Sequence, residues 1–173
     1  MNISDHIIDD ARYIASPNYD SRPEKTSISL IIIHAISMPA GEYVTENIVK
    51  LFTNELNPDD HPDFKAVSDL KVSSHLLITR SGDVLQFVPF HKRAWHAGIS
   101  VFKEQENCND FSIGIELEGC DDDIFEEIQY EALNSILNLL KKEYLIPDKN
   151  IVGHQHVAPE RKTDPGPNFD WSK

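Results

Sequence analysis

Apolar and polar residues along the chain follow patterns that predict several β-strands. A β-branched apolar run at 27–34 (SISLIIIH) and a shorter one at 150–154 (NIVGH) are typical of buried strands. Over 111–119 (FSIGIELEG), apolar residues alternate with small or polar ones, which indicates a strand with two different faces. Two further apolar runs, joined across Ser81-Gly82-Asp83, predict a β-hairpin over 74–90.

Helices are predicted at three places. The segment 45–56 (TENIVKLFTNEL) has apolar residues at helical spacing, and Thr45 is its expected N-cap. A longer amphipathic helix is expected over 123–144, with Asp123 and Glu126 as a capping box at its start. A short helix is expected near 5–14, followed by an irregular arm. Together with the strands, these helices predict an α/β fold with one central mixed β-sheet flanked by helices.

Length and charge limit the number of domains and the kinds of binding partner. The 173 residues are about one domain's worth, so we expect a single domain over 1–173, with residues 1–26 packed on it as an arm. Sixteen Lys and Arg residues against 29 Asp and Glu residues give a net charge of −13. This charge argues against nucleic-acid partners, which need clustered cations, and against binding to an anionic membrane surface.

Segments for export or anchoring are not evident in the pattern. No apolar run approaches the ~20 residues of a membrane span, and the N-terminal stretch lacks the basic and apolar regions of a secretory signal. Cys108 and Cys120 are too few for a disulfide scaffold, and we expect both to be free thiols. We therefore expect a cytoplasmic protein, present as a monomer.

Candidate metal ligands stand at the ends of two predicted strands. His34 closes the run at 27–34, and His154 closes the run at 150–154. In open α/β sheets, sites form at strand ends, and two histidines with one carboxylate are a suitable ligand set for zinc. Asp164, on a proline-stiffened loop that we expect to be extended, is able to supply the carboxylate. The residues alone are also compatible with hydrogen-bonded strand-end histidines and a turn aspartate, and this alternative stays open here.

Two more residues suit hydrolytic chemistry beside such a metal. Glu116 lies on the polar face of its predicted strand, where a carboxylate is a candidate general base for an attacking water. Lys162 lies two residues before Asp164, so both point to one side of an extended chain, and its ammonium is able to stabilise a developing oxyanion. The alternatives, a solvated edge-strand glutamate and a solvated loop lysine, remain open at this stage.

Several motifs together carry a resemblance to a known family. The segments GHQHVAPERKTDPGPNFDW, RAWHAG, CNDFSIGIELEG, IIIHAISMPAGEY and SPNYDSRP are similar to those of the zinc N-acetylmuramoyl-L-alanine amidases of the type-2 amidase family. Within that family the resemblance is strongest to the cytosolic enzymes that act on 1,6-anhydro-N-acetylmuramyl-L-alanine. It covers nearly the whole chain, from about Ser16 to Trp171, and APERKTDPGP is its most specific part.

The resemblance implies a role for each candidate residue and a fold shared with peptidoglycan-recognition proteins. His34, His154 and Asp164 would hold one Zn²⁺ per chain, Glu116 would act as the base, and Lys162 would stabilise the oxyanion. The substrate groove would be lined by a further set, Arg161, Trp95 and His96. The implied reaction is hydrolysis of the amide between anhydro-N-acetylmuramic acid and the L-alanine of the stem peptide, in peptidoglycan recycling.

Two positions differ from the usual pattern of this family. Ala35 stands where relatives often have Asn, and His156 stands where they usually have Asp or Asn. His156 is therefore an alternative to His154 as a ligand, and an ordinary core role for Trp95 also stays open. The competing functions are an amidase acting on intact cell wall, a module that binds peptidoglycan without cutting it, and a metal-free α/β protein.

Overall fold

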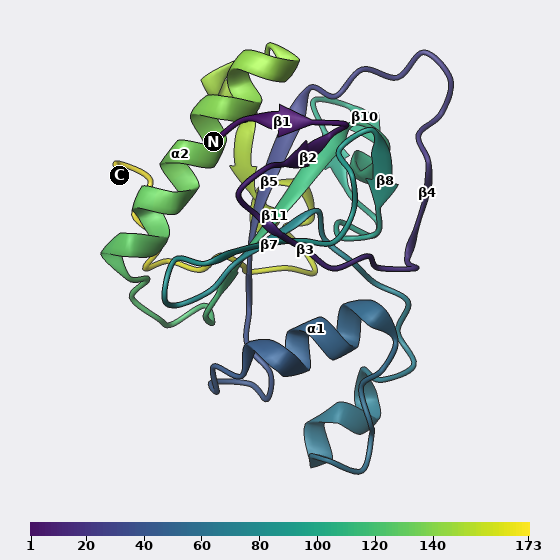
Figure 1. Cartoon of the computed structure of the whole chain (residues 1–173), viewed down its shortest axis with the longest axis vertical. Helices are drawn as coiled ribbons and strands as arrows, with labels where there is room; N and C mark the ends of the chain where they lie inside the picture. Colours follow the sequence, from purple (N-terminus) through teal and green to yellow (C-terminus); the bar gives the residue numbers. More distant parts are fainter.

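A six-stranded mixed sheet forms the centre of the molecule (Figure 1). The computed structural model describes all residues, 1–173. The strands lie in the order β12 (Ile151–Gly153), β5 (Leu30–Ile36), β11 (Ser112–Glu118), β6 (Leu76–Ile78), β7 (Val84–Gln86) and β3 (Arg12–Tyr13). The first four strands are parallel, β7 is antiparallel to β6, and β3 is parallel to β7. The predicted mixed sheet is therefore confirmed.

Shorter elements complete the fold. The helices are α1 (Thr45–Thr53), α2 (Glu127–Tyr144) and the single turn α3 (His154–Val157), with 3₁₀ turns at Pro62–Ala66, Cys108–Asp110 and Asp148–Asn150. Three two-stranded pairs lie outside the central sheet. They are β1 (Ile3–Ser4) with β2 (Ile7–Ile8), β4 (Tyr19–Ser21) with β8 (Lys92–Ala94), and β9 (Val101–Phe102) with β10 (Gln105–Glu106).

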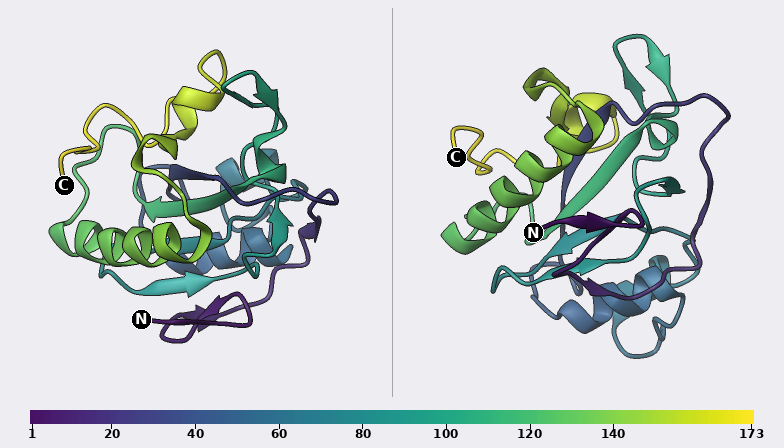
Figure 2. Two further views of the ribbon diagram at one scale, coloured as in Figure 1. Left: turned by 90° about the horizontal axis from the view of Figure 1, so that it is seen from above. Right: turned by 45° about the horizontal axis from the view of Figure 1, so that its top comes forward.

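The two long parallel strands, β5 and β11, have different residues on their two faces. Ile31 and Ile33 of β5 pack with α2 in the largest apolar cluster, whereas Leu30 and Ile32 belong to a cluster on the other face. Because side chains alternate along a strand, His34 lies on the face away from α2. Figure 2 shows α2 extended along one side of the sheet.

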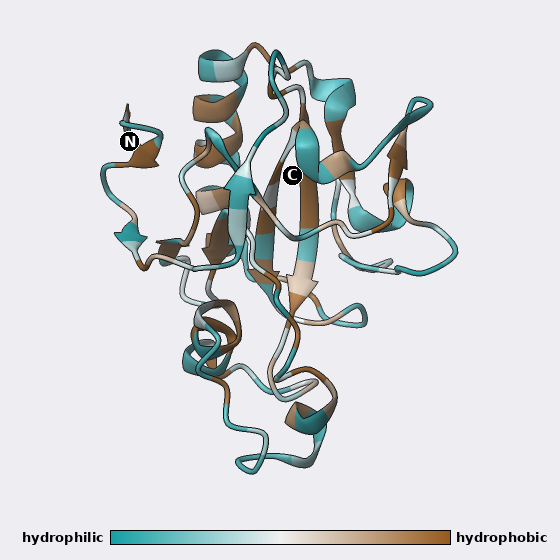
Figure 3. Cartoon of the chain, turned by 90° about the vertical axis from the view of Figure 1, so that its right-hand side faces the viewer, coloured by the Kyte–Doolittle hydropathy of each residue, from teal (hydrophilic) through white to brown (hydrophobic).

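Packing on both faces explains why β11 is buried throughout and β5 is buried from Leu30 to His34. On one face, α2 contributes Leu133, Ile136 and Leu140 to the cluster. On the other, α1 contributes Ile48 and Phe52 to a cluster that also includes side chains of β6 and β7. Figure 3 shows apolar colouring through the central strands and polar colouring over the outer loops. Fully burying a large apolar side chain contributes about 1.5–3 kcal/mol, so these clusters stabilise the sheet strongly.

The helix predicted near residues 5–14 is wrong. Asp5 and His6 have positive φ angles of 48° and 65°, and they turn the chain back so that β1 pairs antiparallel with β2. Positive φ at two successive central residues is the geometry of a tight hairpin and is incompatible with a right-handed helix. The chain then continues into β3, which joins the edge of the central sheet.

Two predicted helix starts are corrected by the structure. Val44, not Thr45, is the N-cap of α1, and the Thr45 hydroxyl instead donates to Glu118 at 2.7 Å. The capping box of α2 is formed by Glu126 and Gln129 rather than by Asp123 and Glu126. The Glu126 N–H donates to the Gln129 side chain at 3.0 Å, so the box sits one turn later than predicted.

Other expectations agree with the structure. β6 and β7 form the predicted hairpin, with Gly82 at a φ of +83° in its turn. Cys108 and Cys120 are unpaired. No helix combines the length and the apolar character that crossing a membrane requires.

Arg22, in the arm formed by residues 1–26, is held against the main body by backbone carbonyls. Its guanidinium donates to the carbonyl oxygens of four residues, at distances of 2.8–3.2 Å: Phe90, Asn109, Asp110 and Ser112. Burial lowers the pKa of Arg22 to about 10, so the side chain stays charged at neutral pH. A neighbouring pair, Arg93 and Asp20, joins β8 to β4 through an ion pair.

Candidate metal centre and active site

His34 and His154 meet on the face of the sheet away from α2. Their Nδ1 atoms lie 3.0 Å apart, and both side chains are buried. Neither histidine ends a strand as predicted, because β5 continues to Ile36 and His154 is the first residue of α3. The pairing of β12 with β5 still brings the two together, since Gly153 is the register partner of Ile33.

Asp164 completes a cluster of three ligand atoms. Its Oδ2 lies 3.1 Å from Nδ1 of His34 and 3.2 Å from Nδ1 of His154. All three ligand atoms lie within 4.8 Å of one another, which is a possible metal site. The loop that carries Asp164 was predicted to be extended, and this prediction is wrong. The segment instead folds into the turn of α3 and a series of further turns.

The electrostatics of this cluster suit metal binding. Burial lowers the pKa of His34 to about 4, so its imidazole is neutral and has a lone pair available for a metal. Burial alone would raise the pKa of Asp164, but its close contacts with the His154 and His34 side chains outweigh burial and hold this pKa well below the usual range. The neutral imidazole of His34 and the carboxylate of Asp164 are thus available together at neutral pH.

Glu116 lies beside this cluster in the centre of the sheet. It is the register partner of His34 on the neighbouring strand, and only 7% of its surface is exposed. A solvated edge position is therefore excluded. Burial raises the pKa of Glu116 well above its usual value, and the nearby charge of Asp164 raises it further, whereas Lys162 opposes the shift. A buried carboxylate with a raised pKa is typical of a residue that accepts and returns protons.

Lys162 and Trp95 line the same cavity as the cluster. The cavity has a volume of about 220 Å³, and its walls include the three ligand residues, Glu116, and apolar side chains from α1. Lys162 and Asp164 both face it, although the loop that carries them is not extended. Trp95 is partly exposed at its wall, so its ring is available to a ligand rather than sealed in the core.

Arg161 and His156 lie apart from the cluster. Arg161 is exposed, and its Nη2 donates to the carbonyls of Ala97 at 2.6 Å and Ile99 at 3.0 Å. It borders a second groove, of about 520 Å³, next to His156. The Nδ1 atom of His156 accepts the N–H of Gly153 at 2.9 Å, and its ring packs near Trp171. These contacts turn His156 away from His34, which disfavours it as the alternative ligand.

His96 contacts His34 on the ring nitrogen that faces away from the other two ligand residues. It borders the cavity, but its Nδ1 lies 2.9 Å from Nε2 of His34, and its Nε2 lies 3.2 Å from Oγ of Ser112. The neighbouring Ala97 carbonyl lies 3.0 Å from Nε2 of His154. Sequence reasoning missed this carbonyl, because a backbone acceptor has no signature in residue type.

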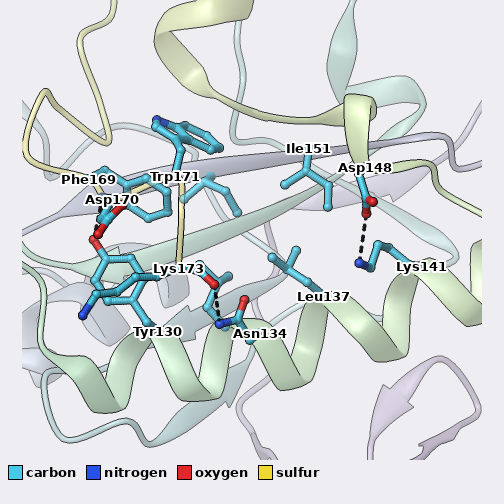
Figure 4. A pocket seen from close by; sticks show the side chains of 12 residues that line it. Tyr130, Asn134, Leu137, Lys141, Asp148, Ile151, Phe169, Asp170, Trp171 and Lys173 are labelled. Atoms are coloured by element: carbon cyan, nitrogen blue, oxygen red, sulfur yellow. Dashed lines mark hydrogen bonds and ion pairs between the residues drawn. The ribbon is translucent and has the colours of Figure 1, made fainter.

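A separate pocket lies on the opposite face of the sheet (Figure 4). It has a volume of about 350 Å³ and lies between α2 and the C-terminal segment, where Tyr130, Leu137 and Trp171 are among its walls. Ile33, the neighbour of His34 in β5, also lines it, so the two sites lie back to back across the sheet. It contains none of the three ligand residues.

The cavity therefore combines a metal-ligand set, a buried carboxylate and an ammonium group. These are the functional groups typical of a metal-dependent hydrolase. Comparison with known families agrees: residues 24–167 match the model of the N-acetylmuramoyl-L-alanine amidase family. The chain belongs to this family.

Individual relatives are similar over nearly the full length. The chain is 49% identical to the 1,6-anhydro-N-acetylmuramyl-L-alanine amidase AmpD of Citrobacter freundii over 164 residues, covering 95% of this chain and 88% of the relative. It is 48% identical to AmpD of Escherichia coli, covering 94% of this chain and 89% of the relative.

Solved structures share the fold. A crystal structure of an AmpD derivative superposes with a TM-score of 0.97 at 47% identity, covering 99% of this chain and 96% of the other. The complex of the Escherichia coli amidase AmiD with anhydro-N-acetylmuramic acid-L-Ala-D-γ-Glu-L-Lys has a TM-score of 0.62 at 29% identity, covering 87% of this chain and 58% of the other. The predicted type-2 amidase fold is therefore confirmed.

Proposed function

We propose that this protein is a zinc-dependent amidase that cleaves the bond between anhydro-N-acetylmuramic acid and the L-alanine of a stem peptide. The observation that carries the proposal is the convergence of His34, His154 and Asp164 with Glu116 and Lys162 in one cavity. The substrate class is supported by the identity of about half of the residues with enzymes named for this activity.

The ligand set fits zinc and disfavours harder cations. Two imidazole nitrogens and one carboxylate oxygen are typical ligands of catalytic zinc, whereas Mg²⁺ and Ca²⁺ prefer all-oxygen sites. His34, His154 and Asp164 would hold one ion per chain, and three protein ligands leave a coordination position open. When bound, zinc polarises a carbonyl and lowers the pKa of water towards ~7.

Glu116 and Lys162 have complementary roles in the proposed hydrolysis. The carboxylate of Glu116 takes a proton from the attacking water and returns it to the nitrogen of the leaving L-alanine. Its raised pKa suits both steps, because a strongly acidic carboxyl would release that proton but would not take it up. The Lys162 ammonium faces the same cavity and stabilises the negative charge that develops on the amide oxygen.

Trp95 and Arg161 are the proposed substrate contacts outside the reacting groups. The partly exposed ring of Trp95 at the cavity wall is suited to cover a sugar face. Arg161 lies at the border of the neighbouring groove, where a cation is able to receive a carboxylate of the acidic stem peptide. Local cations are needed for this, since the protein carries a net charge of −13.

We place this reaction in peptidoglycan recycling in the cytoplasm, with the protein acting as a monomer. Two unpaired cysteines suit a reducing compartment. The proposed ligands, Glu116 and Lys162 all converge within one chain.

The test is an assay on two substrates, anhydro-muramyl tripeptide and its non-anhydro counterpart, with chelator-treated enzyme as the blank. Zinc-dependent release of free peptide from the anhydro substrate alone is the expected result. Comparable cleavage of both substrates would contradict the anhydro preference and indicate an enzyme for intact cell wall. Cleavage of neither, with substrate still bound, would indicate a binding module instead.

A further inference from the structure

We infer that His96 is a positioning residue for the metal centre, acting on the ligand His34, and that the segment Trp95–Ala97 orients both ligand histidines. This inference rests on the proposed zinc site. It assigns to His96 a role in holding the site rather than in contacting substrate.

The contact between the two imidazoles defines how His96 acts. His34 faces His154 and Asp164 with Nδ1, so its metal-binding lone pair is on that atom and its Nε2 carries the proton. Nε2 therefore donates to Nδ1 of His96 at 2.9 Å. Such a hydrogen bond on the far nitrogen fixes both the tautomer and the ring orientation of a metal-binding histidine.

The surroundings of His96 hold its ring in this acceptor role. With Nδ1 accepting, the proton of His96 is on Nε2, which donates to Oγ of Ser112 at 3.2 Å. The ring lies directly over Gly114, where an added Cβ would come within 2.5 Å of it. Gly114 and Ser112 both belong to β11, the strand that carries Glu116. The site therefore depends on a glycine that leaves space for an imidazole.

The same segment also contacts the second ligand histidine. The carbonyl of Ala97 lies 3.0 Å from Nε2 of His154, so His154 donates to it and keeps Nδ1 free for the metal. Oδ1 of Asn109 accepts the N–H groups of His96 at 3.2 Å and Ala97 at 2.8 Å, which fixes the segment. One short stretch of chain thus sets the orientation of both imidazoles.

A pair of nearly isosteric variants separates hydrogen bonding from packing. In His96→Asn, the amide oxygen occupies the place of Nδ1 and still accepts from His34, whereas His96→Leu places a methyl group there. Zinc affinity is measured by competition with a chromogenic chelator. The visible absorption spectrum of the cobalt-substituted protein reports the coordination geometry, and the melting temperature of the metal-free protein reports folding.

We expect His96→Leu to bind zinc about 10–100-fold more weakly than wild type and to shift the cobalt spectrum. His96→Asn should recover most of the affinity and the wild-type spectrum. Wild-type affinity in a folded His96→Leu variant would overturn the inference. An equal loss in both variants would also overturn it, because packing alone would then explain the effect.

A second variant keeps the test decisive if His96→Leu does not fold. Asn109→Ala removes the acceptor for two N–H groups of the segment without touching either ligand histidine. It should weaken zinc binding in the same direction, and unchanged affinity would contradict the role of the segment. Wild-type protein that takes up no zinc would overturn the proposed function and this inference together, whereas a tight wild-type site with unaffected variants overturns the inference alone.

Discussion

The Nδ1 atoms of His34 and His154 lie 3.0 Å apart, although 120 positions separate the two residues in the sequence. The parallel pairing of β12 with β5 brings them together on one face of the sheet, next to Glu116 on β11. Strands far apart in sequence thus place His34, the start of α3 with His154, and the proposed base around one cavity.

Glu116→Gln should retain zinc and lower kcat by about 10²–10⁴-fold, the usual contribution of a general base. The amide matches the carboxylate in shape but does not accept the proton of water. Kinetics and metal content of the purified variant provide the measurement. Glu118→Gln is the matched control, because Glu118 is equally buried on the same strand face but accepts hydrogen bonds from Thr45 and Arg80. It should lose stability and keep kcat, and the reverse pattern would refute the assignment.

Asp164→Ala should lose zinc at neutral pH, because two imidazoles alone hold the ion weakly. Metal analysis after dialysis measures the zinc content. Asp170→Ala, which removes an exposed carboxylate from the same C-terminal segment, should keep one zinc per chain. If Asp164→Ala also retains one zinc, the third ligand has to be another residue.

Gly114→Ala should destabilise the protein and weaken metal binding, because the new methyl group would come within 2.5 Å of the His96 ring. Overpacking of this kind costs about 1–3 kcal/mol. For a chain of this length, each kcal/mol lowers Tm by about 2–4 °C. In a His96→Ala background the same substitution should cost much less, since the clash is removed. Equal costs in both backgrounds would show that the two residues are independent.

Asp20→Asn should lower stability at neutral pH but not in acid. Hydrogen bonds from Arg93, one of them at 2.6 Å, lower the pKa of Asp20 below its usual value. The folded state therefore favours the charged form, so the stabilisation is present above about pH 4 and is lost as the pH falls through the folded pKa.

The expected effect at pH 7 is small, because 41% of the Asp20 side chain is exposed and solvent screens the pair. A loss of about 1 kcal/mol, or about 2–4 °C in Tm, is a reasonable upper value. Thermal melts of wild type and Asp20→Asn from pH 7 to pH 3 measure it, with exposed Asp69→Asn as the control. A difference that grows towards acid would contradict the assignment.

The sequence predicted the centre of the fold better than its edges. The β-branched run and the alternating run became β5 and β11, because both patterns report burial directly. The helix near residues 5–14 was wrong because Asp5 and His6 adopt positive φ angles, which spacing alone does not reveal. The shifted start of α2 has a similar cause, since Asp123 and Glu126 satisfy the capping pattern as well as Glu126 and Gln129 do.

The residues of the candidate site were predictable from the sequence, but some of their contacts were not. The three ligand candidates, Glu116 and Lys162 came from predicted strand ends and residue spacing, and the family resemblance added their roles. The structure brings all five residues into one cavity, although their roles stay predictions. The orientation of the His96 side chain could not be predicted from the sequence. It depends on the space over Gly114 and on a hydroxyl of Ser112, contacts that only the assembled strand β11 defines.

Arg22 has a consequence for how the molecule is completed during synthesis. Arg22 is synthesised before any of its four carbonyl partners, which lie at residues 90 to 112. The arm therefore cannot dock until almost two-thirds of the chain has been made. Its partners include Asn109 and Ser112, whose side chains contact His96 and its segment. The family match begins only at residue 24, so a fragment trimmed to that boundary would leave these carbonyls without their shared donor. The earliest-made part of the chain therefore docks late, against the residues whose side chains hold the His96 segment.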